Sequence, residues 1–513
     1  MMNDLKKELS NAKQPTENGA VGYVTTGKEL LDLNFKTNSL RNMGENEILN
    51  LFLKAFYEDK LLAIKWLFFL RDREGMGERR SFRVILNGLG HQHPNVAKEL
   101  ISLVPEYGRW DDLYFLMDGD LTKIVAKFIY IQFLKDVKSC QEQKPISLLA
   151  KWLPKESTKK YKRIYNILVK EFNMTPAEYR KVTSTLRKYS NVLEVKLSAN
   201  EWNKVDYNIV PSKANLLYKD AFVKHDSERR LMYLDSLKNG DKDIKINAKV
   251  LMPHEIVHSY EEKSLYGYGN LKKYDETLEQ LWKALPDYVK GEDFSMFVRD
   301  SSGSMTTRIG NTNISCMDVS TALAIYFAER CKGEYKDSFI TFSSRPEVID
   351  LSECSTLHDK LERCYVEDDC SNTDIYKVFK LILDTAVKNE YTQEQLPKNI
   401  VICSDLEFDE ATTVNSWYDC DYSDMDTLFE DIQKEYAQHG YKFPRLVFWN
   451  VCSRTGSIPL KENDNGVCLV SGMSPTIMDM VLSGELNPYK CLVDKLNSDR
   501  YKAVEEAVKS VLN

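Results

Sequence analysis

A short run of oxygen-bearing side chains lies at residues 300–304, where the sequence reads Asp-Ser-Ser-Gly-Ser. Asp300, Ser302 and Ser304 alternate, so an extended-to-turn backbone can direct one carboxylate and two hydroxyl groups toward a single point. Oxygen-only ligands of this kind suit Mg²⁺, Mn²⁺ or Ca²⁺, and not zinc. The segment therefore predicts a divalent-cation site with Mg²⁺ as the first choice, whereas a serine-rich turn without a metal is the plainer interpretation.

Two later residues can complete this site. Thr373 precedes a predicted helix at residues 374–387, and Asp405 follows a predicted strand at residues 399–403. In an open α/β sheet, ligands bind at the carboxyl ends of strands, and the topology can bring both residues to that edge. We therefore expect Thr373 to supply a hydroxyl group and Asp405 to supply a second carboxylate.

Catalytic interpretations of the same segment fit less well. A phosphatase of the Asp-x-Asp type needs a carboxylate at position 302, and an aspartic protease needs the glycine one residue before Gly303. A serine hydrolase needs Gly-x-Ser-x-Gly and a P-loop needs Gly-x-x-x-x-Gly-Lys-Ser/Thr, and the sequence contains neither. We therefore predict no catalytic residue, and we expect the ion to bridge to an acidic group.

Alternating strands and helices must position this site. After residue 291, short apolar runs predict strands at residues 295–298, 338–342, 347–351, 399–403, 445–451 and 466–470. Between them, helical spacing predicts helices at residues 317–331, 357–364, 374–387 and 424–438, and the tail from Pro475 is helical. This order indicates a doubly wound, Rossmann-like α/β domain, in which the strand at residues 347–351 suits an antiparallel edge.

The motif and the order of elements resemble the von Willebrand factor type A domains. Their metal-ion-dependent adhesion site has the form Asp-x-Ser-x-Ser with a later Thr and a later Asp, which this chain matches at Asp300, Ser302, Ser304, Thr373 and Asp405. The resemblance implies a type A domain over residues 291–513, in which a partner's carboxylate completes the ligands of the ion. Leu406 stands where many members of the family have glycine.

The preceding part of the chain reads differently. Over residues 26–290, apolar residues recur at spacings of three and four, and strand-like alternation is scarce. A run of short helices of this kind favours a HEAT-like α-solenoid or a helical bundle. The polar residues 1–25 are expected to form a flexible N-terminus.

The two parts also differ in charge. Residues 1–290 contain 48 Lys+Arg and 39 Asp+Glu, and the remainder contains 22 Lys+Arg and 38 Asp+Glu. A basic part suits a polyanion and an acidic part suits a cation. Basic residues gather around residues 71–80 and over residues 151–200, and the second region contains 12 Lys+Arg but only 4 Asp+Glu.

These basic regions predict a contact with single-stranded or structured RNA, because cations bind phosphates and interleaved tyrosines can stack on unpaired bases. The tyrosines are Tyr161, Tyr165, Tyr179 and Tyr189. The predicted RNA-binding residues are Arg71, Arg73, Arg79, Arg80, Lys159, Lys160, Arg163, Arg180, Lys181, Arg187 and Lys188. The alternative is a solvated helix face with internal ion pairs.

Two segments of the basic part resemble the helical module of the Ro ribonucleoprotein (TROVE) family. They read Arg-Asp-x-x-Gly-x-Gly-Glu-Arg from Arg71 and Pro-Glu-Tyr-Gly-Arg-Trp-Asp-Asp-Leu from Pro105. Proteins of that family join a ring of paired helices to a type A domain and bind small structured RNAs. A closer likeness, through Lys-Trp-Leu-Pro from Lys151 and Pro-His-Glu from Pro253, is to an uncharacterised family of the same layout. The resemblance implies a non-enzymatic RNA-binding scaffold, with a metal-dependent protein-interaction module as the alternative.

A zinc-dependent hydrolase is a further alternative, because the sequence His-Glu-Ile-Val-His begins at His254. On a helix, His254 and His258 share a face and can bind zinc, with Glu255 as the general base and a third ligand from Glu276 or Glu279. The preceding proline places His254 in the first turn of its helix, which disfavours this interpretation.

The sequence predicts no membrane contact. Its longest apolar stretch, residues 61–70, is interrupted by Lys65 and is too short to span a bilayer. The N-terminus lacks the apolar core of a secretion signal, and eleven cysteines without paired spacing suit a reducing compartment. We therefore expect a cytoplasmic protein.

Overall fold

The computed structural model describes residues 13–15, 21–190, 192–262, 271–289, 295–310, 312–342, 346–366, 375–405, 428–451, 467–475 and 487–512. The chain forms two compact units, and each is discontinuous in sequence. The sheet unit comprises residues 1–62 and 248–497, and the helical unit comprises residues 63–247 and 498–513. The boundary that the sequence predicts near residue 290 lies within the sheet unit of this partition.

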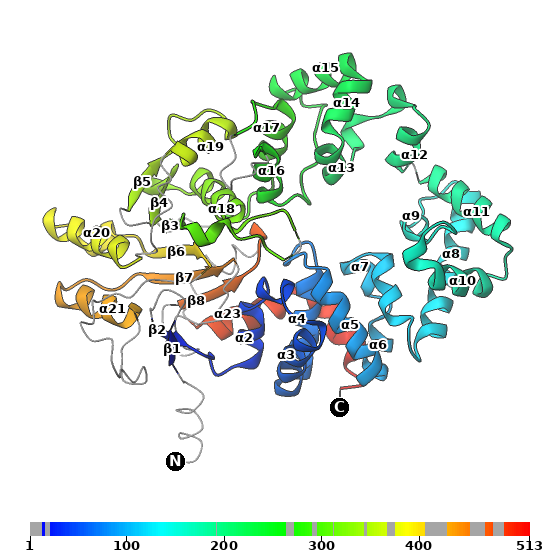
Figure 1. Cartoon of the computed structure of the whole chain (residues 1–513), viewed down its shortest axis with the longest axis horizontal. Helices are drawn as coiled ribbons and strands as arrows, with labels where there is room; N and C mark the ends of the chain where they lie inside the picture. Colours follow the sequence, from blue (N-terminus) through cyan, green and yellow to red (C-terminus); the bar gives the residue numbers. More distant parts are fainter. Residues whose placement is uncertain are drawn as a thin grey trace. The chain divides into compact units, whose positions relative to one another are not determined.

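A six-stranded mixed sheet forms the centre of the sheet unit, with the strand order β5–β4–β3–β6–β7–β8 (Figure 1). The strands are β3 (Ser295–Asp300), β4 (Ser338–Phe342), β5 (Glu347–Asp350), β6 (Asn399–Ser404), β7 (Arg445–Asn450) and β8 (Val467–Ser471). All neighbours are parallel except β4 and β5, which pair antiparallel at the edge. The structure thus has the α/β sheet and the antiparallel edge strand that the sequence predicts.

The central strands β3, β6 and β7 are buried along their whole length. Their near-continuous apolar sequences suit this position, because strands covered on both faces have no solvent side for polar residues. β3 lies between β4, which follows it in the chain, and β6, which comes later. The loops after β3 and β6 therefore begin side by side at the carboxyl edge, at a switch point of the sheet.

The sheet unit also contains helices, several of which connect these strands. They are α3 (Glu45–Glu58), α16 (Pro253–Tyr260), α17 (Glu276–Lys283), α18 (Cys316–Arg330), α19 (Leu357–Val366), α20 (Ile375–Lys388), α21 (Leu428–Gln438) and α23 (Pro488–Leu496). α18 begins with a capping box, in which Asp318 donates its backbone N–H to Ser315 Oγ at 3.0 Å and its carboxylate accepts from the Ser315 N–H at 2.8 Å. This cap fixes the start of the helix that follows the Asp300 segment.

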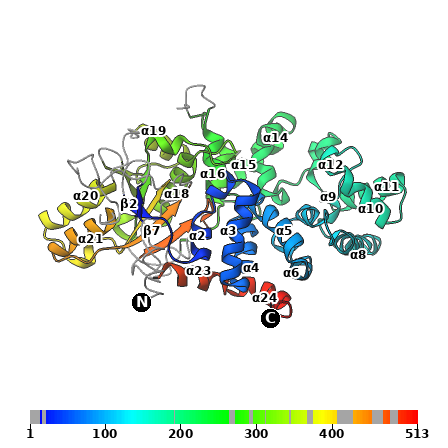
Figure 2. The same cartoon turned by 60° about the horizontal axis from the view of Figure 1, so that its bottom comes forward.

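An N-terminal segment packs on the sheet as well. β1 (Lys13–Pro15) and β2 (Val21–Tyr23) form an antiparallel pair, and α2 (Glu29–Phe35) lies beside α23 (Figures 1 and 2). At the end of β7, Asn450 donates its side-chain N–H to the Phe35 carbonyl at 2.8 Å. The buried Asn38 side chain donates to the Asn450 carbonyl at 3.4 Å. These amides hold the N-terminal segment against the carboxyl end of the sheet.

All regular elements in the described part of the helical unit are helices. The α-helices are α4 (Lys60–Arg71), which begins in the sheet unit, α5 (Arg80–Gln92), α6 (Pro94–Leu100), α7 (Val104–Tyr107), α8 (Thr122–Gln141), α9 (Leu149–Trp152), α10 (Lys162–Glu171), α11 (Pro176–Tyr189), α12 (Leu193–Ser198), α13 (Ser212–Leu217), α14 (Lys219–His225), α15 (Ser227–Lys238) and α24 (Lys502–Val508). None of the described helices has the length and apolarity needed to cross a membrane.

The C-terminal tail is held within the helical unit by charged and aromatic contacts. Arg500 donates to the buried Asp72 carboxylate at 2.8 Å. Tyr501 stacks on Tyr107 with ring centroids 5.9 Å apart. The tail therefore completes the core of a unit that begins more than four hundred residues earlier in the chain.

Candidate functional site

Asp300 ends the central strand β3, and its side chain is fully buried. The Ser302 backbone N–H donates to Asp300 Oδ1 at 2.9 Å, which turns the chain sharply after the strand. The hydroxyl oxygens of Ser302 and Ser304 lie 2.9 Å apart. The turn therefore gathers two of the predicted hydroxyl ligands within hydrogen-bonding distance, and Ser304 reaches partly to solvent.

The neighbouring strand β6 brings two more side chains to Asp300. Ser404 donates its hydroxyl to Asp300 Oδ2 at 2.5 Å, and the buried Asp405 follows it directly. Burial and the charge of Asp405 raise the pKa of Asp300 to about 7. This arrangement of two carboxyl groups and two hydroxyl groups fits a divalent cation. The ion would neutralise the repulsion between the two carboxylates, and hard divalent cations prefer oxygen ligands.

Four of the five predicted ligands thus lie on the carboxyl edge of β3 and β6, and Thr373 lies outside the described residues. The sequence did not predict that Ser404 is a hydrogen-bond partner of Asp300. The register pairs Arg299 with Cys403, so the next residues along the two strands, Asp300 and Ser404, are neighbours. That pairing depends on the order of the strands, which local sequence does not encode.

The His-Glu-x-x-His segment lies on α16, but its three side chains do not converge. His254 is buried in the first turn, and Glu255 accepts a hydrogen bond from the Met252 backbone N–H at 3.1 Å, as a helix cap. His258 Nδ1 lies 3.0 Å from Asp318 Oδ2 of α18. Among the described residues, His254 belongs to no group of three or more metal-ligating side chains. The arrangement does not fit the zinc hydrolase that the motif offers.

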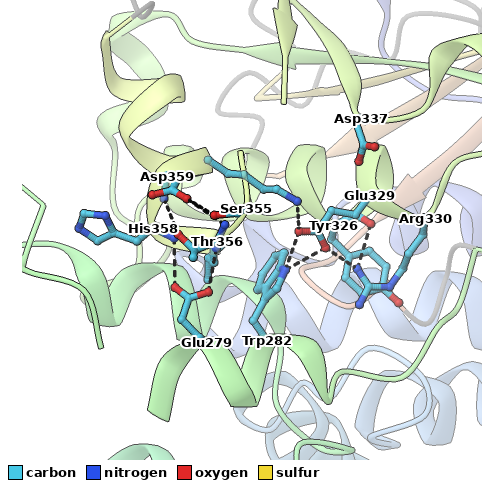
Figure 3. A network of polar contacts seen from close by, with 12 residues as sticks. Glu279, Trp282, Tyr326, Glu329, Arg330, Asp337, Ser355, Thr356, His358 and Asp359 are labelled. Carbon is cyan, nitrogen blue, oxygen red and sulfur yellow. Dashed lines mark hydrogen bonds and ion pairs between the residues drawn. The ribbon is translucent and has the colours of Figure 1, made fainter. Parts of the chain in front are cut away.

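Glu279, the alternative third zinc ligand, has a structural role instead. Its carboxylate accepts the backbone N–H of Leu357 at 2.8 Å and that of His358 at 3.1 Å, and so caps the first turn of α19. Figure 3 shows it pointing to this turn, while Trp282 of the same helix donates to Glu329 of α18 at 2.9 Å. α17 therefore fastens α18 to α19.

A buried ion network lies in the helical unit. Asp112 is fully buried and accepts from Arg71 at 2.8 Å and from Arg83 at 2.6 Å. Asp111 accepts from Arg83 and from Arg109, each at 2.7 Å. Arg71, which the sequence predicts to bind RNA, is only 5% exposed and stabilises this network instead. Three guanidinium groups on two carboxylates leave an excess of positive charge.

Three solvent-exposed cations, Arg73, Arg79 and Lys213, border this network, and we call them the cation cluster. Partial burial and the charge of Arg71 lower the pKa of Arg73, and partial burial and the charge of Arg109 lower that of Arg79. Partial burial and the charges of Arg73 and Arg79 lower the pKa of Lys213 to about 8. All three side chains remain exposed to solvent. Sequence reasoning missed Lys213, which is distant from the arginines in the chain.

The other predicted RNA-binding residues fall into two groups. Arg187 donates to the carbonyls of Ala150 and Leu153, each at 2.8 Å, and so ties α11 to α9. Those with exposed side chains are Arg80, Lys159, Lys160, Arg163, Arg180, Lys181 and Lys188. Arg187 is therefore a structural residue, whereas the side chains of the other group are exposed to solvent.

Two of the four tyrosines are not the stacking platforms that the sequence predicts. Tyr165 and Tyr179 are 3% and 2% exposed, and their rings pack edge to face with centroids 5.3 Å apart. Both tyrosines belong to the buried faces of helices α10 and α11. The helical periodicity of a buried face is the same as that of a binding face, so the sequence pattern does not distinguish the two. Tyr161 and Tyr189 keep partly exposed rings.

These features define a protein with a helical unit and a doubly wound α/β unit that carries an acidic and hydroxyl-rich site at its switch point. Residues 294–510 match a family described as a domain of unknown function (DUF7788), and residues 121–292 match another (DUF2828). An uncharacterized protein of Acanthamoeba polyphaga mimivirus, L728, is 29% identical over 526 residues, covering 94% of this chain and 86% of its own. The crystal structure of the Deinococcus radiodurans Ro (RSR) protein is similar with a TM-score of 0.40 and 12% identity, covering 89% of this chain and 93% of that one. Similarity at that level does not indicate a shared function.

Proposed function

We propose that this chain is a non-enzymatic RNA-binding scaffold, in which the helical unit binds phosphate groups and the sheet unit is a type A domain with a divalent cation as a docking point. The cation cluster is the observation that carries this proposal. Arg73 and Arg79 are close enough to Lys213 to lower its pKa, and an anion placed among the three cations would relieve that repulsion. Guanidinium and ammonium groups in such a cluster suit the phosphates of a nucleic acid.

A charge-reversal experiment tests the proposal. The double variant Arg73→Glu/Arg79→Glu is expected to bind structured RNA at least about tenfold more weakly than the wild type and to lower the salt slope by about 2, because two phosphate contacts are lost. Filter binding at two salt concentrations measures both quantities. Lys127→Glu is the matched control, since Lys127 is exposed on α8 of the same unit. Equal losses in the control and in the double variant, or no RNA binding by the wild type at low salt, would contradict the proposal.

RNA binding is also expected to depend on pH. Lys213 has a lowered pKa of about 8, so its charge is present below that pH and is lost as the pH rises through it. Between pH 7 and pH 9 the affinity should therefore fall, by up to about tenfold for one phosphate contact. The Lys213→Arg variant keeps its charge throughout and should bind equally at both values. If the affinity of Lys213→Arg falls between pH 7 and pH 9 as much as that of the wild type, another group is responsible for the pH dependence.

The sheet unit supports a second part of the proposal. Asp300, Ser302 and Ser304 would hold a Mg²⁺ ion with Asp405 nearby, and one open position would accept a carboxylate or phosphate from a partner. The Asp300 segment matches none of the catalytic sequence patterns considered above, which favours docking over hydrolysis. If RNA binding fails while Mg²⁺ binding holds, the chain is better described as a metal-dependent protein-interaction module.

A further inference from the structure

A second group of metal-ligating side chains lies apart from Asp300, where the end of α16 meets the first turn of α18. His258 Nδ1 is 3.0 Å from Asp318 Oδ2 and 3.3 Å from Glu261 Oε2. One ligand atom from each of the three residues lies within 4.8 Å of the other two. The group combines one imidazole nitrogen with two carboxylates from separate segments of the chain.

The surrounding contacts hold both carboxylates in place. Tyr365 of α19 donates its hydroxyl to Glu261 Oε1 at 3.0 Å, and Ser315 donates its backbone N–H to Asp318 Oδ2 at 2.8 Å. The Asp318 side chain is fully buried, yet its Oδ1 atom has no hydrogen-bond partner. A buried carboxylate oxygen without a partner is costly, and an ion in this group would supply one.

We propose that His258, Glu261 and Asp318 bind a zinc ion. Zinc takes nitrogen and carboxylate oxygen ligands at about 2.0–2.2 Å, so two ligands of a tetrahedral ion lie about 3.4 Å apart. The observed separations of 3.0 and 3.3 Å are close to this edge length. An imidazole ligand favours zinc over magnesium, whereas the oxygen-only site at Asp300 favours magnesium. The site uses only one histidine of the His-Glu-x-x-His segment.

Such an ion would have a structural effect on the first site. It would tie the end of α16 to the first turn of α18, the helix that follows the Asp300 segment. Residues Arg308 and Ser315 bridge across the connecting loop, so the zinc site would also hold one end of that loop. The fourth position of the ion remains open to water, because His258 and Glu261 are 30% and 27% exposed. The proposal depends on neither RNA binding nor magnesium binding.

Zinc analysis of the full-length protein tests this inference. The purified chain is stripped with a chelator, saturated with Mg²⁺, incubated with ZnCl₂ and desalted, and its zinc content and melting temperature are measured. We expect one zinc ion per chain and a higher melting temperature than in the Mg²⁺ form. A wild-type chain that retains no zinc overturns the proposal, and the three side chains then form an imidazolium bridge between two carboxylates.

Matched variants locate the ion. His258→Ala and Glu261→Gln are each expected to weaken zinc binding by more than about a hundredfold, because each removes a direct ligand. His358→Ala removes an imidazole from a second histidine–carboxylate group, formed with Asp359 and Glu362 in the same unit, and should keep the zinc. Circular dichroism shows whether each variant is folded, and Glu261→Gln preserves size where His258→Ala does not. Zinc that is lost from His358→Ala, or kept in both variants of the proposed site, contradicts the assignment.

Discussion

The Asp300→Asn variant is expected to lose all stabilisation by Mg²⁺ and, without metal, to be more stable than the wild type. Asp300 is fully buried beside Asp405, and its pKa of about 7 lies above the value of a free aspartate. Ionising a group whose pKa is raised by folding destabilises the fold, and this effect is complete above about pH 7. A neutral amide removes it, with a gain of about 2–4 kcal/mol in the free energy of unfolding.

The amide also fits the hydrogen bonds of the carboxylate that it replaces. Its oxygen can accept the Ser302 N–H, and its NH₂ group can donate to the Ser404 hydroxyl, which then acts as acceptor. The charge that attracts the cation is lost, however, and a second carboxylate alone is a weak ligand set for Mg²⁺. Metal-free stability and metal response should therefore change in opposite directions.

Thermal unfolding with and without Mg²⁺ measures both effects. For the wild type, Mg²⁺ at a hundredfold excess over Kd adds about 2.7 kcal/mol, which corresponds to a shift of about 5 °C in Tm. The control is Asp350→Asn, which changes an exposed aspartate at the end of edge strand β5 and should keep the full Mg²⁺ response. A wild type that Mg²⁺ does not stabilise, or an Asp300→Asn variant that it still stabilises, would rule out the predicted site.

The Asp112→Ala variant is expected to destabilise the helical unit by about 3–5 kcal/mol, because it leaves two buried guanidinium groups without their shared carboxylate. Arg71 and Arg83 contact Asp112 at 2.8 and 2.6 Å, and both are buried. The Arg109 backbone N–H donates to the same carboxylate at 2.9 Å. A Cβ atom on Gly108 would lie 2.5 Å from Asp112 Oδ2, so the pocket is also closely packed.

Urea unfolding, followed by circular dichroism and by tryptophan fluorescence, measures the loss. Asp118→Ala is the matched control, because Asp118 pairs with His91 at 3.2 Å at the surface and is 40% exposed. Exposed pairs of this kind contribute about 0–1 kcal/mol. If both variants unfold at the same urea concentration as the wild type, the buried network does not stabilise the unit as we expect.

Much of the fold follows from local sequence. Continuous apolar runs determine the strands of the sheet, since a strand buried on both faces cannot alternate, and the predicted bounds of β4 match the observed ones. Spacings of three and four determine helices such as α11 (Pro176–Tyr189) in the part of the chain where the sequence predicts a run of short helices. The alternation of Asp300, Ser302 and Ser304 likewise sets the composition of the candidate metal site, because a single turn contains all three side chains.

Only the tertiary structure decides which distant residues meet. Strand order places Ser404 and Asp405 beside Asp300, helix packing joins His258 to Asp318, and the helical unit brings Lys213 to Arg79. Periodicity states that one face of a helix is apolar, but it does not distinguish a core stripe from a binding face. That is why Tyr165 and Tyr179 are buried, although their spacing also suits contact with RNA. Local sequence determined the elements and the ligand types, whereas register and packing, which depend on the whole chain, determined their partners.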